Sequence, residues 1–370
     1  MISLFDFGGF VDKILAPFRW DIGVDLGSSN VLIYLRERGV VVDEPAMVAR
    51  PKKKRWTGLS APKLSNLRPI AFGTKAKEMV NREPIHIEVV NPIKNGIISD
   101  MESAEDMITY YLRLVYEIPS KYPKFLKPKV LVGVPGFVTD VQKRAVKTIF
   151  LAAGAAQVML VEESILAAIG AGMPVNKSSG LLVVDIGGGK TEVSLVSMGG
   201  VVLTRASKVA GIELDNNIVN YVRMKYGVLI GPGTAERVKI ESGRIFDGEG
   251  GSHSLVRGRD LESGLPRSIK LSASEIQEAV GLEVGKIVKM VKTVLDETPP
   301  ELMDDILKRG IILVGSGAKL KGLDREIEKE TKIVTRVTED PGMSVIFGCG
   351  ALIENRELLG QVRLVSGYRE

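Results

Sequence analysis

One stretch of the sequence has residue types that suit phosphate binding: LLVVDIGGGKTEVSLVSMGG, residues 181–200. Gly189-Lys190-Thr191 matches the last residues of a P-loop, whose glycine-rich backbone cradles phosphates. A P-loop also needs a glycine five positions before Gly189 and a helix after the threonine. Position 184 is valine, and the residues after Lys190 largely alternate polar and apolar, which is the period of a strand. The stretch therefore predicts a strand, a glycine turn and a second strand, and it is not a P-loop.

An earlier segment repeats this pattern. VDLGSSNVLIYLRERGVV (24–41) matches VDIGGGKTEVSLVSMGGV (184–201), which aligns Asp25 with Asp185 and Gly27 with Gly187. Both segments predict an aspartate at the end of a strand, a turn of small residues and a second strand. Agreement along the whole unit favours a duplicated half-domain over a chance match between two β-hairpins.

The residue types in the two turns suit a metal-bound triphosphate. Backbone N–H groups of tight turns rich in Gly and Ser converge on one point and bind phosphate oxygens. A carboxylate at the end of a strand can hold Mg²⁺ directly or through water. We therefore expect the two hairpins to grip a triphosphate from both sides, with the metal between Asp25 and Asp185.

The composition narrows the class of protein. With 370 residues, 45% of them hydrophobic and 26% charged, the chain is long enough for two or more domains with ordinary cores. One cysteine excludes a disulfide framework, and two histidines leave no cluster for zinc or redox-metal chemistry. A net charge of +5 with 5% aromatic residues does not indicate nucleic-acid binding. No apolar run is long enough to span a bilayer.

The segments between and after the hairpins predict an α/β fold with helices flanking a sheet. Residues 129–172 contain two strand–helix pairs: 130–134, a helix capped by Thr139-Asp140 that runs to about Ala153, 158–161, and 163–169. Residues 308–327 predict a strand, a Gly-Ser-Gly turn and a helix, whose N-terminus could cradle an adenosine and its α-phosphate.

Two other segments have more than one interpretation. Glu236 and Lys239 lie on one face of the helix predicted in residues 231–243, and taken alone such a pair is more often a solvated surface ion pair than a ligand contact. Residues 1–20, MISLFDFGGFVDKILAPFRW, place large apolar side chains at helical spacing without the basic start of a secretory signal. We expect an amphipathic helix in a membrane interface; the alternative is a helix that packs on the body of the protein.

Taken in order, these segments resemble the superfamily of actin, heat-shock chaperone and sugar kinase ATPases, and within it the MreB family of bacterial actin-like rod-shape proteins. The resemblance covers about residues 20–357 and includes IGVDLGSSNVLIYL, LVEESILAAIGAG, VVDIGGGKTEVSLVSMGG, GTAERVKIESG and EDPGMSVIFGCGALIEN. It implies an actin-like α/β ATPase fold of two domains, each a ribonuclease-H-like core with a small subdomain, and a nucleotide in the central cleft.

The resemblance also implies subdomain boundaries. After the N-terminal segment 1–20, large subdomain IA comprises residues 21–48, 98–177 and 347–370, and small subdomain IB comprises 49–97. Large subdomain IIA comprises residues 178–213 and 280–346, and small subdomain IIB comprises 214–279.

Carried over residue by residue, the resemblance implies a site for ATP and Mg²⁺. Asp25 and Asp185 serve the metal, and Glu163 polarises the attacking water. The phosphate turns comprise Gly27, Ser28, Ser29, Asn30, Gly187, Gly188 and Gly189. The sugar, the base and the α-phosphate are surrounded by Gly211, Glu213, Glu236, Lys239, Gly315, Ser316 and Gly317.

Lys190 departs from the family pattern, which has Thr-Thr after the glycines, with the first threonine helping to place the hydrolytic water. The expected catalytic set is therefore Glu163, Lys190 and Thr191. A lysine here could offset the charge of the γ-phosphate, or pair with Glu163 and lower its pKa, so that nucleotide binding survives while hydrolysis is slowed or re-tuned. The alternative is that Lys190 points to solvent and changes nothing.

For function, the resemblance implies a cytoskeletal ATPase whose filaments, paired antiparallel, lie on the inner face of the cell membrane and direct cell-wall synthesis. Its partners would be further copies of the chain, the membrane surface, and membrane proteins of the elongation machinery, without nucleic acid. Residues 1–19 and an apolar tip at Phe125 and Leu126 would contact lipid, which gives a cytoplasmic, membrane-peripheral location. Residues 51–69 predict an exposed basic loop.

Two alternatives stay open. An ATP-binding filament protein with little or altered hydrolysis is consistent with Lys190. A small-molecule kinase of the same superfamily would need a catalytic aspartate and polar substrate groups in the cleft, and no segment resembles such a substrate site.

Overall fold

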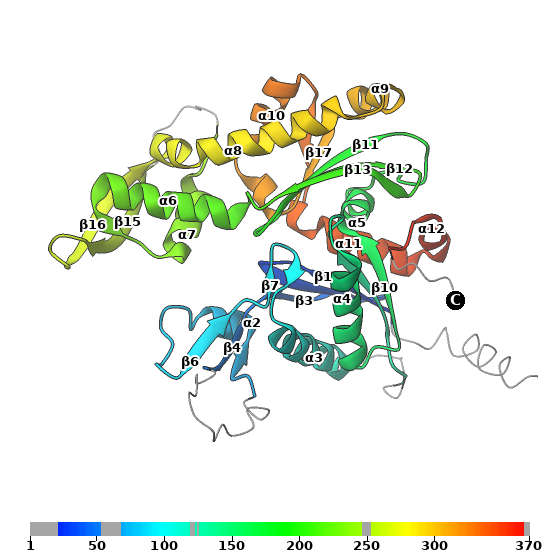
Figure 1. Ribbon diagram of the computed structural model, residues 1–370, viewed down its shortest axis with the longest axis horizontal. Helices are drawn as coiled ribbons and strands as arrows, with labels where there is room; N and C mark the ends of the chain where they lie inside the picture. Colours follow the sequence, from blue (N-terminus) through cyan, green and yellow to red (C-terminus); the bar gives the residue numbers. More distant parts are fainter. Residues whose placement is uncertain (1–20, 53–67, 119–122, 124–125, 246–252, 366–370) are drawn as a thin grey trace, which may run out of the picture.

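The computed structural model of the chain describes residues 21–52, 68–118, 123, 126–245 and 253–365. The predicted amphipathic segment, Phe125, and most of the predicted basic loop lie outside these residues. Figure 1 shows two layered halves, one around the sheet that contains β1 and the other around the sheet that contains β11. None of the helices in the described ranges is long and apolar enough to cross a bilayer.

The first half is built on a five-stranded sheet in the order β10-β9-β1-β2-β3. Its strands are β1 (Asp21–Leu26), β2 (Asn30–Leu35), β3 (Gly39–Pro45), β9 (Lys129–Val134) and β10 (Gln157–Glu162). β1 pairs antiparallel with β2 and parallel with β9. The apolar strands are buried on both faces, as expected for a sheet covered by helices on each side. The helices are α3 (Met101–Glu117) and α4 (Asp140–Ala152) on one face, and α5 (Glu163–Gly170) and α11 (Ser344–Glu354) on the other.

The second half repeats this plan with a sheet in the order β13-β12-β11-β17-β18. Its strands are β11 (Leu181–Ile186), β12 (Thr191–Ser197), β13 (Gly200–Ser207), β17 (Ile311–Val314) and β18 (Thr335–Val337). β11 pairs antiparallel with β12 and parallel with β17. One face is covered by helices α6 (Gly211–Tyr226), α8 (Ala273–Asp296), α9 (Pro300–Arg309) and α10 (Leu323–Thr331). The other face shares a core with α5 and α11, which therefore lie between the two sheets.

The two equivalent hairpins, β1–β2 and β11–β12, confirm the strand–turn–strand pattern predicted for both segments. Asp25 is the penultimate residue of β1 and Asp185 is the penultimate residue of β11. Asp25 pairs in register with Leu32, and Asp185 pairs in register with Glu192. The aspartates therefore occupy matching places, one residue before the end of each central strand.

Helix starts follow local signals in the sequence. The Thr139 hydroxyl accepts a hydrogen bond from the Gln142 N–H, and the Gln142 side chain accepts one from the Thr139 N–H, which is a capping box at the start of α4. Ser272 and Glu275 form the same arrangement at the start of α8. The predicted helix from residue 140 to about 153 is confirmed, and so is the helix that begins at Glu163.

Smaller elements extend both halves at the same end of the molecule (Figure 1). The first half carries β4 (Val48–Pro51), β5 (Ala71–Phe72), α2 (Gly73–Lys77), β6 (Ile87–Val90), and the hairpin of β7 (Ile93–Lys94) and β8 (Ile97–Ile98). The second half carries β14 (Val228–Leu229), α7 (Pro232–Ser242), β15 (His253–Asp260) and β16 (Pro266–Ser272). The chain also forms η2 (Ser316–Lys319), η3 (Pro341–Met343) and α12 (Arg356–Gln361).

The predicted order of strand, Gly-Ser-Gly turn and helix is present, but a short helical turn separates the glycine turn from the α-helix. β17 is followed by the short 3₁₀ helix η2, and α10 begins only at Leu323. Gly315 has φ +80° and Gly322 has φ +84°, a left-handed conformation that favours glycine and interrupts a right-handed helix. These two positions separate the turn from α10.

Candidate functional site

Two glycine turns meet between the halves of the molecule. The first, residues 27–29, joins β1 to β2, and the second, residues 187–190, joins β11 to β12. A Cβ atom added at Gly189 would lie 2.8 Å from the Oγ of Ser28, and one added at Gly188 would overlap the Oγ of Ser29. The missing side chains therefore let the two turns approach each other.

The first turn is held from the side by the β7–β8 hairpin. The Gly96 N–H donates to the Oγ of Ser28 at 2.7 Å, and the Asn91 side chain donates to the Ser28 carbonyl at 2.6 Å. Asn30, predicted to belong to this phosphate turn, is the first residue of β2, and its side-chain amide donates to Asp43 at 2.6 Å. The sequence reasoning missed Asn91 and Gly96, although the Asn-Gly pair at residues 95–96 is a hairpin signal.

Acidic side chains gather beside the two turns. Burial raises the pKa of Asp25 well above its usual value, and the charges of Glu163 and Asp185 raise it further. Asp185 is only 8% exposed, and burial raises its pKa as well. Three carboxyl groups from different strands and helices thus lie close enough to influence one another's ionisation. They belong to β1, β11 and the first turn of α5.

Asp25 and Asp185 have the donor chemistry that Mg²⁺ requires. Mg²⁺ is usually bound through one or two carboxylates, while substrate phosphates and water complete its coordination. The structure places no group of three or more His, Cys, Asp or Glu around a metal position in its described part. Two carboxylates beside a glycine turn would suit Mg²⁺ bound together with a nucleotide.

Lys190 is buried and paired, so the alternative in which it points to solvent is wrong. Its Nζ lies 2.7 Å from the Oε2 of Glu163 and 2.8 Å from the Oε2 of Glu192. Lys190, Glu163 and Glu192 are 7%, 5% and 2% exposed. Burial alone would lower the pKa of Lys190, but the two carboxylates outweigh it and raise that pKa, so the ammonium is charged.

The pairing with Lys190 does not give Glu163 a low pKa. Burial raises the pKa of Glu163 to about 7, and the Lys190 charge opposes this rise without cancelling it. Lys190 does act to lower the pKa of Glu163, as predicted. The predicted net direction is nevertheless wrong, because desolvation of the buried carboxylate raises this pKa by more.

Glu192 is a member of this cluster that the sequence reasoning missed. Its second oxygen, Oε1, accepts hydrogen bonds from the Gly136 N–H at 3.1 Å and from the Ser194 hydroxyl at 3.3 Å. Glu192 therefore connects β12 to the loop after β9 while it holds Lys190. Its position directly opposite Asp185 in the β11–β12 hairpin was the available signal.

Thr191 does not join the cluster. Its side chain is fully buried, and its hydroxyl donates to the Val209 carbonyl at 2.6 Å, on the way from β13 to α6. The backbone of the second turn is also bonded to α6, because the Gly211 N–H donates to the Gly187 carbonyl and the Ile212 N–H donates to the Gly188 carbonyl. Thr191 thus fixes the second turn to the segment between β13 and α6.

The residues predicted to surround the adenosine come together only in part. Lys239 on α7 donates to the Gly211 carbonyl at 2.9 Å and pairs with Asp215 at 2.8 Å. Glu236 instead pairs with Lys77 of α2 at 3.6 Å. Glu213 is exposed on the first turn of α6. Asp215, which the sequence reasoning missed, is the residue that fixes Lys239.

The predicted Gly-Ser-Gly turn lies beside the end of β11. A Cβ atom at Gly317 would lie 2.8 Å from the Ile186 carbonyl oxygen, and one at Gly315 would overlap both this oxygen and the side chain of Asp185. Ser316 begins η2 between these two glycines. The turn is therefore adjacent to the candidate metal-binding aspartate of the second half.

Two other features of the structure bear on the predictions. Leu126 is buried, at 8% exposed, so its predicted role as a membrane-inserting tip is wrong.

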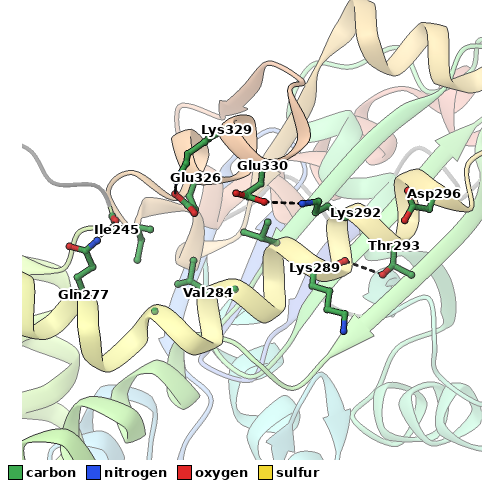
Figure 2. A pocket seen from close by; sticks show the side chains of 13 residues that line it. Ile245, Gln277, Val284, Lys289, Lys292, Thr293, Asp296, Glu326, Lys329 and Glu330 are labelled. Carbon is green, nitrogen blue, oxygen red and sulfur yellow. Dashed lines mark hydrogen bonds and ion pairs between the residues drawn. The ribbon is translucent and has the colours of Figure 1, made fainter.

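A cavity of about 790 Å³ lies away from the glycine turns, between α8 and α10 (Figure 2). The ion pair between Lys292 and Glu330, 2.8 Å long, connects its two walls. No residue of the glycine turns or of the acidic cluster lines this cavity, so it is separate from the candidate site.

Comparison with known proteins shows similarity along nearly the whole chain. The family model of the MreB/Mbl proteins matches residues 19–361. The cell shape-determining protein Mbl of Bacillus subtilis (strain 168) is 38% identical over 347 residues, which are 94% of this chain and 99% of Mbl. The cell shape-determining protein MreB of Escherichia coli (strain K12) is 40% identical over 348 residues, 94% of this chain and 97% of that protein.

Solved structures agree in fold. MreB5 of Spiroplasma citri, in a crystal structure bound to AMPPNP, has a TM-score of 0.81 at 34% identity and covers 90% of this chain and 96% of its own. The same protein bound to ADP has a TM-score of 0.82. Because the MreB5 structure matches 90% of this chain at a TM-score of 0.81, it confirms the predicted actin-like fold.

Proposed function

This chain belongs to the MreB/Mbl family of actin-like proteins, and on that premise we propose that it binds ATP with Mg²⁺ and polymerises into filaments that maintain cell shape. The nucleotide would lie between the two glycine turns. Support comes from the relative MreB5, which is 34% identical and was crystallised with AMPPNP and with ADP. The subdomain boundaries given above belong to the same proposal.

The observation that carries this proposal is the convergence of two equivalent hairpins on one acidic cluster. Asp25 and Asp185 occupy the same position in two duplicated strands, and each is followed by a turn of small residues. The turns touch through Ser28, Ser29 and the glycines of the second turn. Such an arrangement offers carboxylates to a cation and backbone N–H groups to phosphate oxygens.

Each part of the site has a role in this proposal. Asp25 and Asp185 would hold Mg²⁺, which when bound neutralises phosphate charge and polarises the γ-phosphoryl group. The turn residues would position the phosphates. The sugar and base would lie near Gly211, Lys239 and the Gly-Ser-Gly turn, with Asp215 keeping Lys239 in place. Glu163 would accept a proton from the attacking water as the general base.

Lys190 would slow the hydrolysis step. A general base must have its carboxylate free to contact water, and Glu163 instead holds the Lys190 ammonium at 2.7 Å. Because both side chains are buried, bulk water does not screen this ion pair. The same observation favours the second candidate function, a filament protein that binds ATP with little or no hydrolysis.

We also propose that the filaments, paired antiparallel, lie on the inner face of the cell membrane and direct cell-wall synthesis together with membrane proteins of the elongation machinery. The amphipathic pattern of residues 1–19 is the support from this sequence. Individually weak lipid contacts would be multiplied along a filament by avidity. We propose no nucleic-acid partner.

Negative-stain electron microscopy of the purified full chain tests the proposed function. Filaments should form with ATP and Mg²⁺ and should be absent without nucleotide. Asp25→Asn combined with Asp185→Asn should abolish the filaments and the Mg²⁺-dependent part of nucleotide binding, since both proposed metal-binding carboxylates are lost. A chain that consumes ATP with a small-molecule acceptor and forms no filaments would instead support the kinase alternative.

A further inference from the structure

The Lys190 ammonium is surrounded by more carboxyl groups than it can neutralise. It contacts Glu163 at 2.7 Å and Glu192 at 2.8 Å. Glu192 pairs in register with Asp185 across the β11–β12 hairpin. The Cγ of Glu163 lies 3.2 Å from a Cβ built at Gly133, which pairs in register with Asp25. Four acidic groups therefore share one permanent cation at the place where the second turn meets the first half.

The position of this cation is fixed by packing as well as by charge. A Cβ atom at Gly96 would lie 3.1 Å from both the Cδ and the Cε of Lys190, so the lysine stem passes close over the β7–β8 turn. The Nζ lies 5.8 Å from the centre of the Phe137 ring. Glu192, which is itself bonded to the Gly136 N–H and to Ser194, holds the ammonium from the other side. Lys190 is thus a preorganised charge within the site.

An acidic cluster repels a triphosphate unless cations compensate for its charge. In a site whose only cation is Mg²⁺, removal of the metal leaves the phosphates facing bare carboxylates in a poorly solvated environment, where charge interactions are strong. Here a second cation stays in place when the metal is removed. Its two partners, Glu163 and Glu192, lie beside Asp25 and Asp185, the carboxylates that would hold the metal.

We propose that Lys190 is a built-in cation of the nucleotide site that partly replaces Mg²⁺ in nucleotide binding. The protein would then retain substantial nucleotide affinity without the metal. This inference rests on the proposed nucleotide-binding function and deepens it. It concerns binding only and is separate from the effect of Lys190 on hydrolysis.

Calorimetric titration of AMPPNP into the full chain, in excess Mg²⁺ and again in excess EDTA, tests this proposal. Wild type is compared with Lys190→Thr and with Lys190→Met, which keeps the long apolar stem that packs on Gly96 but removes the charge. Lys308→Thr is the control, because it removes an exposed positive charge on α9. Thermal unfolding checks the fold of each variant, and Lys190→Met provides the test if Lys190→Thr does not fold.

Transfer from Mg²⁺ to EDTA should weaken binding to both Lys190 variants by about tenfold more than it weakens binding to wild type or Lys308→Thr. An equal loss in all four proteins would overturn the inference while leaving nucleotide binding intact. A wild type that loses all measurable binding in EDTA would overturn it as well. Absence of AMPPNP binding by wild type in Mg²⁺ would instead overturn the proposed function, and the inference with it.

Discussion

The Nζ of Lys190 and the Oε2 of Glu163 lie 2.7 Å apart and connect the second glycine turn to the first residue of α5. The turn belongs to one half of the molecule and Glu163 to the other. The lysine ammonium therefore contacts both the proposed general base and Glu192. Binding and hydrolysis of the nucleotide should respond differently when this contact is changed.

Glu163→Gln should separate the two activities. The amide keeps the size of the side chain but cannot accept a proton from water, so phosphate release should fall by about a hundredfold. AMPPNP affinity measured by calorimetry should stay within about threefold of wild type, because Glu163 is not a proposed phosphate or metal contact. A variant that still hydrolyses ATP at the wild-type rate would show that another group is the base.

Gly189→Ala should weaken nucleotide binding. The added Cβ would lie 2.8 Å from the Ser28 Oγ and 3.2 Å from the Asn95 nitrogen, so the two turns must move apart. We expect AMPPNP affinity to fall by about tenfold or more, which corresponds to ~1.4 kcal/mol. Gly360→Ala is the matched control, since a Cβ there meets no atom within 4 Å. Equal affinities for the two variants would argue against phosphate binding between the turns.

The stability that Glu275 contributes at the start of α8 should depend on pH. Burial alone would raise the pKa of Glu275, but hydrogen bonds from Ser272, Tyr226 and Lys225 outweigh it and lower that pKa to about 2. A carboxylate with a lowered folded-state pKa contributes stability above its unfolded pKa, and the contribution is lost as the pH falls toward the folded value. Its contribution should therefore decline below pH 4.5, the ordinary value for this group.

Urea unfolding of Glu275→Gln checks this expectation. Because glutamine can also complete a capping box, the substitution removes only the negative charge at the helix N-terminus. It should lower the free energy of unfolding by about 0.5 kcal/mol at neutral pH. The difference from wild type should shrink steadily as the pH is lowered through the acidic range. Glu339→Gln, at an exposed position, serves as the control. A difference that stays constant with pH would mean that the charge of Glu275 does not stabilise α8.

Deletion of residues 1–19 should weaken the attachment of the protein to membranes. The segment carries the predicted amphipathic pattern, and Leu126 is buried and cannot substitute for it as an apolar tip. Co-sedimentation with liposomes should therefore decrease, while ATP binding stays because the glycine turns are unaffected. If the truncated protein still sediments completely, the amphipathic interpretation of this segment is wrong.

Much of the fold could be predicted because its signals are local. In each central hairpin, a strand pattern followed by an aspartate and a turn of small residues predicted the strand–turn–strand unit. The Thr139 cap predicted the start of α4. Gly188 and Gly189 were predicted at the turn because glycine is common in tight turns, and the structure adds that their missing side chains let the two turns approach each other. These features depend on a few neighbouring residues, which a single sequence displays.

The orientation of Lys190 could not be predicted in the same way. It depends on Glu163, which lies on helix α5 in the other half of the molecule. It also depends on Glu192, whose place opposite Asp185 follows from the hairpin register. The net direction of the Glu163 pKa depends on how deeply the three-dimensional structure buries the group. Likewise, only tertiary packing shows that Leu126 is buried and that Lys239 pairs with Asp215 instead of Glu236.

The central claim is that the Lys190 ammonium restrains the general base Glu163, and phosphate release by Lys190→Thr tests it most directly. Loss of the Lys190 charge should raise the pKa of Glu163 further, so the rates are compared at alkaline pH, where Glu163 is ionised. In saturating ATP and Mg²⁺ at this pH, the variant should hydrolyse ATP about tenfold faster than wild type, because Glu163 becomes free to activate water. Adding Glu163→Gln to this variant should remove the gain. A rate for Lys190→Thr that equals or falls below that of wild type, in protein that binds AMPPNP normally, would contradict the account.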